Sequence, residues 1–218
     1  MIAFDFDGVL HDSRERAWRC YQDARSEMDL QDLPDLAGPD ELPVVYQGVL
    51  SASLTRWIDF EVAELFWQRH AELTAHRAAA EPGTLVTELI APLAELAAGL
   101  GYAVVTGSHQ TTVHSLLARD LGAAAMPRIL LARDDPGSKT DKLRALREEH
   151  GASAYVGDTG SDVRHAHAAG LIAVAVAYGY ASEADLKAAG PEHLLATPAD
   201  LAAWCRSQPS ARPASRTT

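Results

Sequence analysis

Short apolar runs alternate with helical patterns along most of this chain, and the alternation restricts the folds it can adopt. The apolar runs, rich in Val, Ile and Ala, are residues 2–6, 102–106, 128–132, 154–156 and 172–177. Leucine or alanine recurs at helical spacing in residues 89–100, 112–121, 140–150 and 162–169. Strands that alternate with helices pair in parallel through right-handed crossovers, and helices cover both faces of the sheet. We therefore predict an α/β fold with a doubly wound parallel sheet.

The first two apolar runs lie about 95 residues apart, which is far more than one crossover helix requires. Residues 14–82 between them read as almost wholly helical, and large apolar side chains recur there at spacings typical of core faces. These side chains are Trp18, Tyr21, Trp57, Phe60, Leu65, Phe66 and Trp67. Pro82 and Gly83 mark the return of the chain, because proline stops a helix and glycine permits a sharp turn.

This pattern predicts how the 218 residues are divided. Residues 1–13 and 83–206 form the α/β core, and residues 14–82 form a smaller helical unit inserted into it. Residues 207–218 carry Pro, Ser, Arg and Thr with almost no apolar side chains, so we expect a disordered tail.

Composition excludes several kinds of partner. The formal net charge of −11 disfavours non-specific binding to nucleic acid or to anionic membranes, since both are repelled at long range. No stretch reaches about 18 uncharged apolar residues, and the N-terminus lacks the basic start of a signal peptide. Cys20 and Cys205 have neither metal-ligand spacing nor a disulfide framework. We expect a soluble cytoplasmic protein without a nucleic-acid or membrane partner.

Two acids, Asp5 and Asp7, stand where the first apolar run breaks at a glycine. Residues i and i+2 of an extended segment face the same way, so both carboxylates can aim at one point beyond the strand. Two like charges placed together repel each other unless a cation, or a proton shared by the pair, relieves the repulsion. A polar loop with an ordinary Asp-Gly turn is the plainer interpretation of the same residues.

Two later strand ends carry matching chemistry. Thr106 and Gly107 offer a hydroxyl and free amides, which suit an anion, although a simple turn also explains them. Asp158 brings a third carboxylate to the same edge of the sheet, and Asp162 stands four residues on, where a helix begins. Asp162 either faces the same crevice or merely complements the helix dipole. Three carboxylate oxygens with water suit a hard cation, and octahedral oxygen ligation favours Mg²⁺.

A lysine in the segment after the apolar run 128–132 is a candidate phosphate ligand, and only three lysines occur in the chain. Lys139 stands before a predicted helix and can reach phosphate oxygens and offset the crowded acids. Lys142 lies one helical turn further on and can fill the same role. We prefer Lys139, because it precedes the helix.

The motif order resembles the haloacid dehalogenase superfamily, in its phosphoglycolate-phosphatase-like branch. The residues that carry the resemblance are Asp5-x-Asp7-Gly-Val, Thr106, Lys139 and Gly157-Asp158-x-x-x-Asp162, with Asp12-Ser13 closing the first motif. Two positions depart from the family pattern: Thr140 follows the lysine where proline is common, and His11 replaces an apolar residue. The resemblance implies a Rossmann-like core with an α-helical cap over residues 14–82.

The resemblance also implies a phosphatase mechanism on a small phosphorylated metabolite. Asp5 is then the nucleophile that becomes an aspartyl-phosphate, and Asp7 is the general acid and base. Asp5, the backbone carbonyl of Asp7 and Asp158 hold Mg²⁺, with Asp162 in support. Thr106, Gly107 and Lys139 bind the phosphate oxygens. The protein is expected to be a monomer or a homodimer.

Other functions are weighed against this one. A dehalogenase needs neither magnesium nor a second acid such as Asp7, and a phosphonate hydrolase needs a lysine that residues 14–82 lack. A phosphomutase shares every residue named here, and a non-catalytic phosphate-sensing module can retain the acids without turnover. The sequence leaves the physiological substrate and the choice between hydrolase and mutase open.

Overall fold

A six-stranded parallel sheet forms the centre of the computed structural model, which describes residues 1–46, 50–80 and 83–208. The strand order is β5-β4-β1-β6-β7-β8. The strands are β1 (Ile2–Phe4), β4 (Tyr102–Val105), β5 (Ile129–Leu131), β6 (Ala154–Gly157), β7 (Ile172–Val176) and β8 (His193–Leu195). Strand β1 lies inside the sheet, because Ile2 pairs in parallel with Tyr102 on one side and Ala154 on the other.

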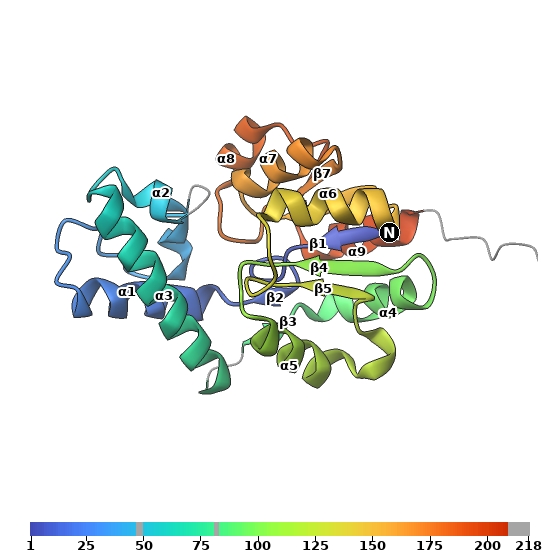
Figure 1. Ribbon diagram of the computed structural model, residues 1–218, viewed down its shortest axis with the longest axis horizontal. Coiled ribbons are helices and arrows are strands. Elements are labelled where there is room, and N and C mark those ends of the chain that lie inside the picture. The colour runs from blue at the N-terminus through green and yellow to red at the C-terminus, as the bar shows by residue number, and fades with distance from the viewer. Residues whose placement is uncertain (47–49, 81–82, 209–218) are drawn as a thin grey trace, which may run out of the picture.

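Helices cover both faces of this sheet, as Figure 1 shows for α6, α7 and α8 above it and α4 and α5 below it. The helices are α4 (Ile90–Ala98), α5 (Gln110–Leu121), α6 (Lys139–His150), α7 (Gly160–Ala169), α8 (Glu183–Ala189) and α9 (Pro198–Ser207). Alternate residues of β1 point to opposite faces, so Phe4 joins the hydrophobic cluster with α4, α5 and α9, and Ala3 joins the one with α6, α7 and α8. The predicted doubly wound α/β fold is confirmed.

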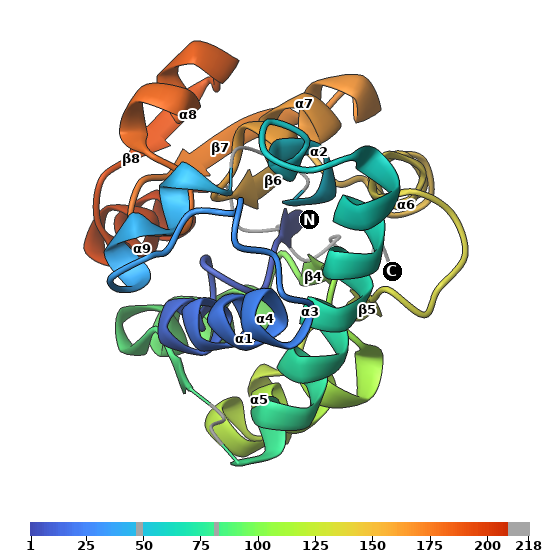
Figure 2. The ribbon, with the colours of Figure 1, turned by 90° about the vertical axis from the view of Figure 1, so that its left-hand side faces the viewer.

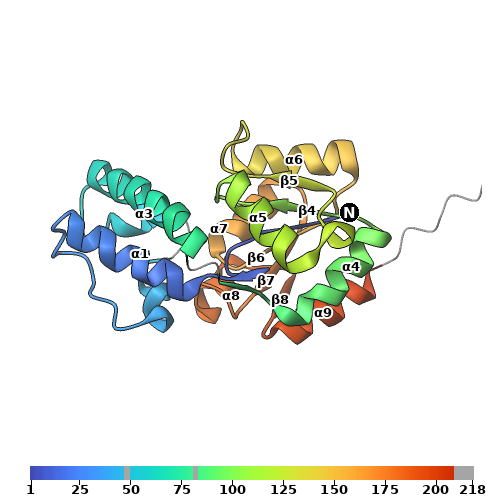
Figure 3. The same cartoon turned by 90° about the horizontal axis from the view of Figure 1, so that it is seen from below.

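A helical insert, residues 14–80, separates β1 from β4 along the chain. It contains α1 (Arg14–Glu27), the 3-10 helix η1 (Pro39–Val44), α2 (Leu50–Leu54) and α3 (Phe60–Ala80). Two short strands, β2 (His11–Asp12) and β3 (Thr84–Leu85), flank it and pair antiparallel where the chain leaves the core and where it returns. Figure 3 shows the insert at one end of the molecule, and Figure 2 shows α1 and α3 facing the viewer at that end.

Most of a third hydrophobic cluster comes from the insert and is built around Tyr21 and Phe66, whose ring centroids lie 5.4 Å apart, and the core contributes Tyr180 to it. Trp18, Trp57 and Trp67 are partly buried against this cluster. The predicted core positions Phe60 and Leu65 are wrong, because these side chains are 60% and 56% exposed. Phe60 is the first residue of α3, and Leu65 lies on the outer surface of that helix, where apolar spacing alone does not assign a face.

Some sequence expectations fall outside the described residues or at their margins. Pro82 and residues 209–218 lie outside them, and α9 continues to Ser207, one residue beyond the predicted end of the core. The predicted division of the chain into domains therefore stays a prediction. Among the described helices, none combines the length and apolarity that crossing a membrane requires.

The aromatic cluster of the insert can be tested by comparing two phenylalanines of the same helix. Phe66→Ala removes a fully buried ring and is expected to lower the free energy of unfolding by about 3–5 kcal/mol. Phe60→Ala removes an exposed ring and is expected to change it by no more than about 0.5 kcal/mol. Urea denaturation measures both values, and equal losses would contradict this description of the insert.

Candidate active site

The carboxyl ends of β1, β4 and β6 open toward the insert, and a cavity of about 330 Å³ lies between them. Asp5 follows β1, Thr106 follows β4 and Asp158 follows β6, so neighbouring parallel strands deliver three polar side chains to one edge. All three line the cavity, together with Asp7, Gly107, Lys139 and Asp162. Every predicted site residue is therefore found in the lining of one cavity.

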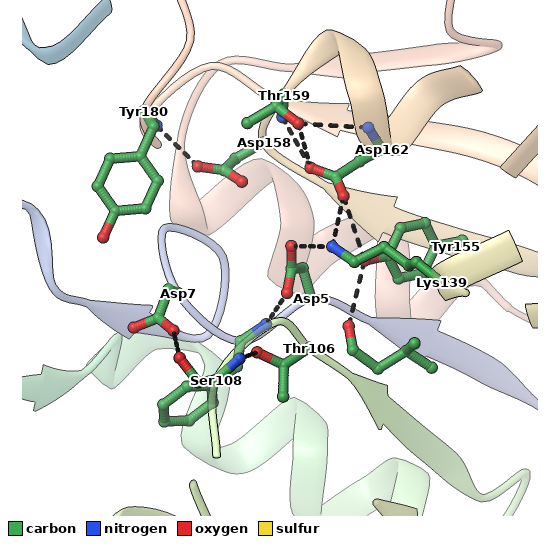
Figure 4. A network of polar contacts seen from close by, with 12 residues as sticks. Asp5, Asp7, Thr106, Ser108, Lys139, Tyr155, Asp158, Thr159, Asp162 and Tyr180 are labelled. Atoms are coloured by element: carbon green, nitrogen blue, oxygen red, sulfur yellow. Dashed lines mark hydrogen bonds and ion pairs between the residues drawn. The ribbon is translucent and has the colours of Figure 1, made fainter. Parts of the chain in front are cut away.

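Three carboxylates gather at the inner end of this cavity. Asp5, Asp158 and Asp162 are buried, and one oxygen of each lies within 4.8 Å of the others. The Lys139 ammonium lies between two of them, 2.7 Å from Asp5 Oδ2 and 2.8 Å from Asp162 Oδ1 (Figure 4). One ammonium thus faces three carboxylates, and the cluster carries an excess of negative charge when all are ionised.

Burial and mutual repulsion shift the titration of these acids. Burial raises the pKa of Asp5 to about 7, against the opposing effect of Lys139. Burial, together with the charges of Asp162 and Asp5, raises the pKa of Asp158 well above its usual range. Burial opposes ionisation of Asp162 as well, yet the charge and hydrogen bond of Lys139 hold its pKa below the usual value. A divalent cation favours the ionised forms, so the donor set fits a hard metal ion such as Mg²⁺.

Backbone and side-chain contacts fix two of these carboxylates. Asp162 Oδ2 accepts hydrogen bonds from Thr159 Oγ1 at 2.5 Å and from Thr159 N at 3.1 Å. The second of these bonds, together with the Asp162 amide that donates to Thr159 Oγ1 at 3.2 Å, forms the capping box that begins α7. Asp158 Oδ2 accepts a hydrogen bond from Tyr180 N at 2.7 Å. Gly8 has φ +76°, and a Cβ there would lie 2.1 Å from Asp158 Oδ2, so only glycine lets this turn approach the carboxylate.

Asp7 lies apart from the three-carboxylate cluster and has different partners. Its Oδ2 accepts a hydrogen bond from Ser108 Oγ at 2.6 Å, and its Oδ1 lies 3.2 Å from Arg16 Nη2. Arg16 belongs to α1 of the insert and is only 4% exposed. The side chain of Asp7 is therefore positioned jointly by the core and the insert.

The two candidate lysines have separate contacts. Lys139 is the first residue of α6, behind the N-cap Ser138, and it reaches the acids. Lys142 Nζ donates instead to the Ala132 carbonyl at 2.5 Å. The position of Lys139 differs slightly from the prediction, since it lies within the first turn of the helix.

At the β4 end, Thr106 Oγ1 accepts a hydrogen bond from Ser108 N at 3.0 Å.

Several cavity residues were not identified as site residues from the sequence. They are Arg16, Trp67, His70, Arg133 and Tyr180. For Trp67, packing in the core of the insert was preferred over a lid above the substrate, and the structure places its side chain both against that core and in the cavity lining. Tyr155 is buried beneath Lys139, and its hydroxyl lies 3.3 Å from Asp162 Oδ1. These contacts join elements distant in the chain, and no local motif marks them.

A parallel sheet with acids and a lysine at its strand ends defines an α/β protein with an acidic site, and comparisons with known proteins specify its family. The family model for haloacid dehalogenase-like hydrolases matches residues 2–176. The chain belongs to this family.

Individual relatives agree with this assignment. The chain is similar to a phosphoglycolate phosphatase from Synechococcus elongatus, with 29% identity over 209 residues, 92% of this chain and 94% of the relative. Among solved structures, it resembles a haloacid dehalogenase-like hydrolase from Streptococcus pneumoniae, with a TM-score of 0.75, 19% identity, and coverage of 93% and 96%. A protein described as a predicted phosphatase from Clostridium acetobutylicum gives a TM-score of 0.72, 19% identity, and coverage of 95% and 98%. The prediction of an enzyme of the phosphatase class is confirmed.

The buried histidine of the cavity gives a pH test. Burial lowers the pKa of His70 to about 4 from an ordinary 6.5, so the unfolded chain takes up this proton at a higher pH than the folded chain. The neutral His70 side chain therefore gives its full contribution to stability above pH 6.5. As the pH falls to about 4, protonation of this residue in the unfolded chain lowers the free energy of unfolding by up to about 3 kcal/mol. Urea denaturation should show a shallower acid loss in His70→Gln, whereas the exposed control His76→Gln should follow the wild type. Identical pH profiles for all three proteins would contradict a neutral buried His70.

Proposed function

We propose that the protein is a Mg²⁺-dependent phosphomonoester hydrolase that acts on a small phosphorylated metabolite through an aspartyl-phosphate. The observation that carries the proposal is the buried Asp5, 2.7 Å from the Lys139 ammonium and clustered with Asp158 and Asp162 at the inner end of one cavity. This arrangement supports the proposal because it would bring a nucleophile, Asp5, close to a cation for phosphate oxygens, Lys139, and close to carboxylate ligands for a metal ion.

Asp5 attacks the phosphorus in this mechanism, forming an oxygen–phosphorus bond while the bond from phosphorus to the leaving alcohol breaks. The Phe6 amide donates to Asp5 Oδ1 at 2.8 Å, which orients the carboxylate. Asp7 first protonates the leaving alcohol and then removes a proton from the water that hydrolyses the aspartyl-phosphate. Asp7 lies apart from the three-carboxylate cluster, which suits a group that transfers protons, because such a group must face the leaving alcohol and not the metal ion.

The remaining cavity residues bind charge. Thr106, the Gly107 amide and Lys139 would bind phosphate oxygens, and Asp162 keeps Lys139 in place through its contact of 2.8 Å. Asp5, the backbone carbonyl of Asp7 and Asp158 would hold Mg²⁺, which when bound neutralises the carboxylates and the incoming phosphate. Burial raises the pKa of Asp5 to about 7, yet the carboxyl group must be ionised to attack. A cation bound beside it would favour the ionised form, and this need for a cation supports the proposed metal site.

The helical insert serves as a cap in this proposal. It contributes Arg16, Tyr46 and Trp67 to the cavity lining, and it is attached to the core through β2 and β3. Closure of such a unit excludes water and completes the site around the substrate. The phosphoglycolate phosphatase among the relatives makes 2-phosphoglycolate the first substrate to assay.

The nucleophile is tested by Asp5→Asn, which keeps the volume of the side chain but removes its charge. We expect phosphate release from a panel of phosphomonoesters with Mg²⁺ to fall by about 10³-fold or more. The melting temperature should stay near the wild-type value or rise, because one of three crowded charges is lost. Asp40→Asn, on an exposed side chain of the insert, is the matched control and should keep its activity. Near-native activity of Asp5→Asn would overturn the assignment.

The metal site is tested by thermal unfolding with and without Mg²⁺. The ion should raise the melting temperature of the wild type, because a ligand that binds only the folded state stabilises it. The shift should be strongly reduced in Asp158→Asn, and chelation with EDTA should abolish wild-type phosphate release. An equal Mg²⁺ shift in Asp158→Asn would contradict the proposed ligand set.

A further inference from the structure

Arg133 is an exposed cation in the lining of the cavity, whereas the clustered acids are buried. It follows β5 in the chain, it is exposed, and it lines the cavity. Its guanidinium carbon lies 5.6 Å from the ring centroid of Trp67 on α3. A guanidinium placed over an aromatic ring is held by its face, and its N–H donors stay available. Core and insert therefore meet at a cation that faces the substrate space.

The backbone around Arg133 is fixed by hydrogen bonds on both sides. The Arg133 amide donates to the Ser108 carbonyl at 2.9 Å, which ties this loop to the loop after β4. The preceding residue, Ala132, accepts a hydrogen bond from Lys142 Nζ at 2.5 Å and donates its amide to Asp135 Oδ2 at 2.7 Å. A binding group on a pinned loop loses little freedom when a ligand arrives.

Two acids follow Arg133 directly in the sequence, and neither forms an ion pair with it. Asp134 Oδ1 lies 2.6 Å from His109 Nδ1, and its Oδ2 accepts a hydrogen bond from Gln110 N at 2.8 Å. Asp135 turns back to the Ala132 amide. Within the described part of the chain, the Arg133 guanidinium has no carboxylate within ion-pair distance, although the protein as a whole is strongly acidic.

The other cations of the cavity are engaged by acids. Lys139 contacts Asp5 and Asp162, and Arg16 contacts Asp7. The α3 face that lines the cavity near Trp67 offers the uncharged residues Ala71, Thr74 and Ala75. The neighbouring His70 is neutral at physiological pH, since burial lowers its pKa to about 4. An anionic group on the leaving-group side of the substrate would therefore find its counter-charge at Arg133.

We propose that Arg133, positioned by Trp67, binds a second anionic group on the substrate and so selects small phosphomonoesters whose leaving alcohol is itself anionic. The inference rests on the proposed phosphatase function. In a protein with net charge −11, an anion entering a cavity lined by four aspartates is repelled unless a local cation compensates. The planar guanidinium matches a carboxylate or a phosphate through paired N–H donors. Phosphorylated hydroxy acids and small bisphosphates share this chemistry.

A matched pair of substrates tests the inference with the full chain and Mg²⁺. One member is 2-phosphoglycolate, and the other is 2-hydroxyethyl phosphate, in which a hydroxymethyl group replaces the carboxylate. The bisphosphate of ethane-1,2-diol forms a third arm, which distinguishes a carboxylate from a second phosphate as the preferred anion. The quantity compared is the ratio of kcat/KM for each substrate that has a second anionic group to kcat/KM for 2-hydroxyethyl phosphate.

The wild type should prefer at least one of the two substrates with a second anion. Arg133→Gln should lower that ratio about 10- to 100-fold, the range expected for loss of a charge-assisted hydrogen bond. Arg133→Lys should lower it less, because the charge remains, and Trp67→Leu should lower it through KM. Arg206→Gln removes an exposed arginine of α9 that does not line the cavity, and its ratio should stay within about twofold of the wild type.

Two results would overturn the inference: a wild type that does not prefer either substrate with a second anion, and an Arg133→Gln variant whose ratio matches that of Arg206→Gln. Hydrolysis of p-nitrophenyl phosphate separates these failures from failure of the proposed function. If that ester is hydrolysed with Mg²⁺ while the substrate preference is absent, the role of Arg133 is wrong and the phosphatase assignment stands. If no ester releases phosphate, the proposed function itself fails.

Discussion

The repulsion among three buried carboxylates is the constraint on which the rest of the site depends. Asp5, Asp158 and Asp162 come from the ends of β1 and β6 and from the first turn of α7, and Lys139 reaches in from the start of α6 to lie between two of them. Such a cluster is tolerable in a folded protein only where cations or protons compensate it. The parallel sheet supplies the geometry, because adjacent strands end at the same edge, and the glycine at position 8 lets the first turn pass close beside the Asp158 carboxylate.

A second interaction couples this rigid centre to the helical insert. Asp7 receives one contact from Ser108 of the core and another from the buried Arg16 of α1. The Tyr46 and Tyr180 rings, whose centroids lie 5.0 Å apart, add a further contact between the two parts, and Tyr180 also forms a hydrogen bond of 2.7 Å with Ser13, the residue that precedes the insert. The orientation of the Asp7 carboxylate therefore depends on where the insert lies. In the proposed mechanism, proton transfer to the leaving group is sensitive to closure of the site.

Most of the fold could be predicted from periodicity, because five of the six strands of the parallel sheet fall on short, almost continuous apolar runs. The edge strand β8 was not predicted, since its three residues, His193–Leu195, are too few to show a pattern. The polar residues at the strand ends could be located for the same reason, since the topology of the sheet alone brings Asp5, Thr106 and Asp158 to one edge. The contacts of Arg16, Trp67 and Arg133 could not be predicted from the sequence, because they depend on how α1 and α3 lie against the core. The error at Phe60 and Leu65 has a similar origin: an amphipathic pattern places a residue on a helix but does not say which side meets a partner.

The antiparallel pairing of β2 and β3 keeps the two ends of the insert side by side, joined in register at His11 with Leu85 and Asp12 with Thr84. A module tethered in this way can be lengthened, shortened or exchanged without altering the spacing between the strands of the main sheet. The buried acids of the cavity thus belong to the core, whereas one wall of the cavity belongs to the insert. That junction would allow the insert to change while the cluster of buried acids in the core keeps its arrangement.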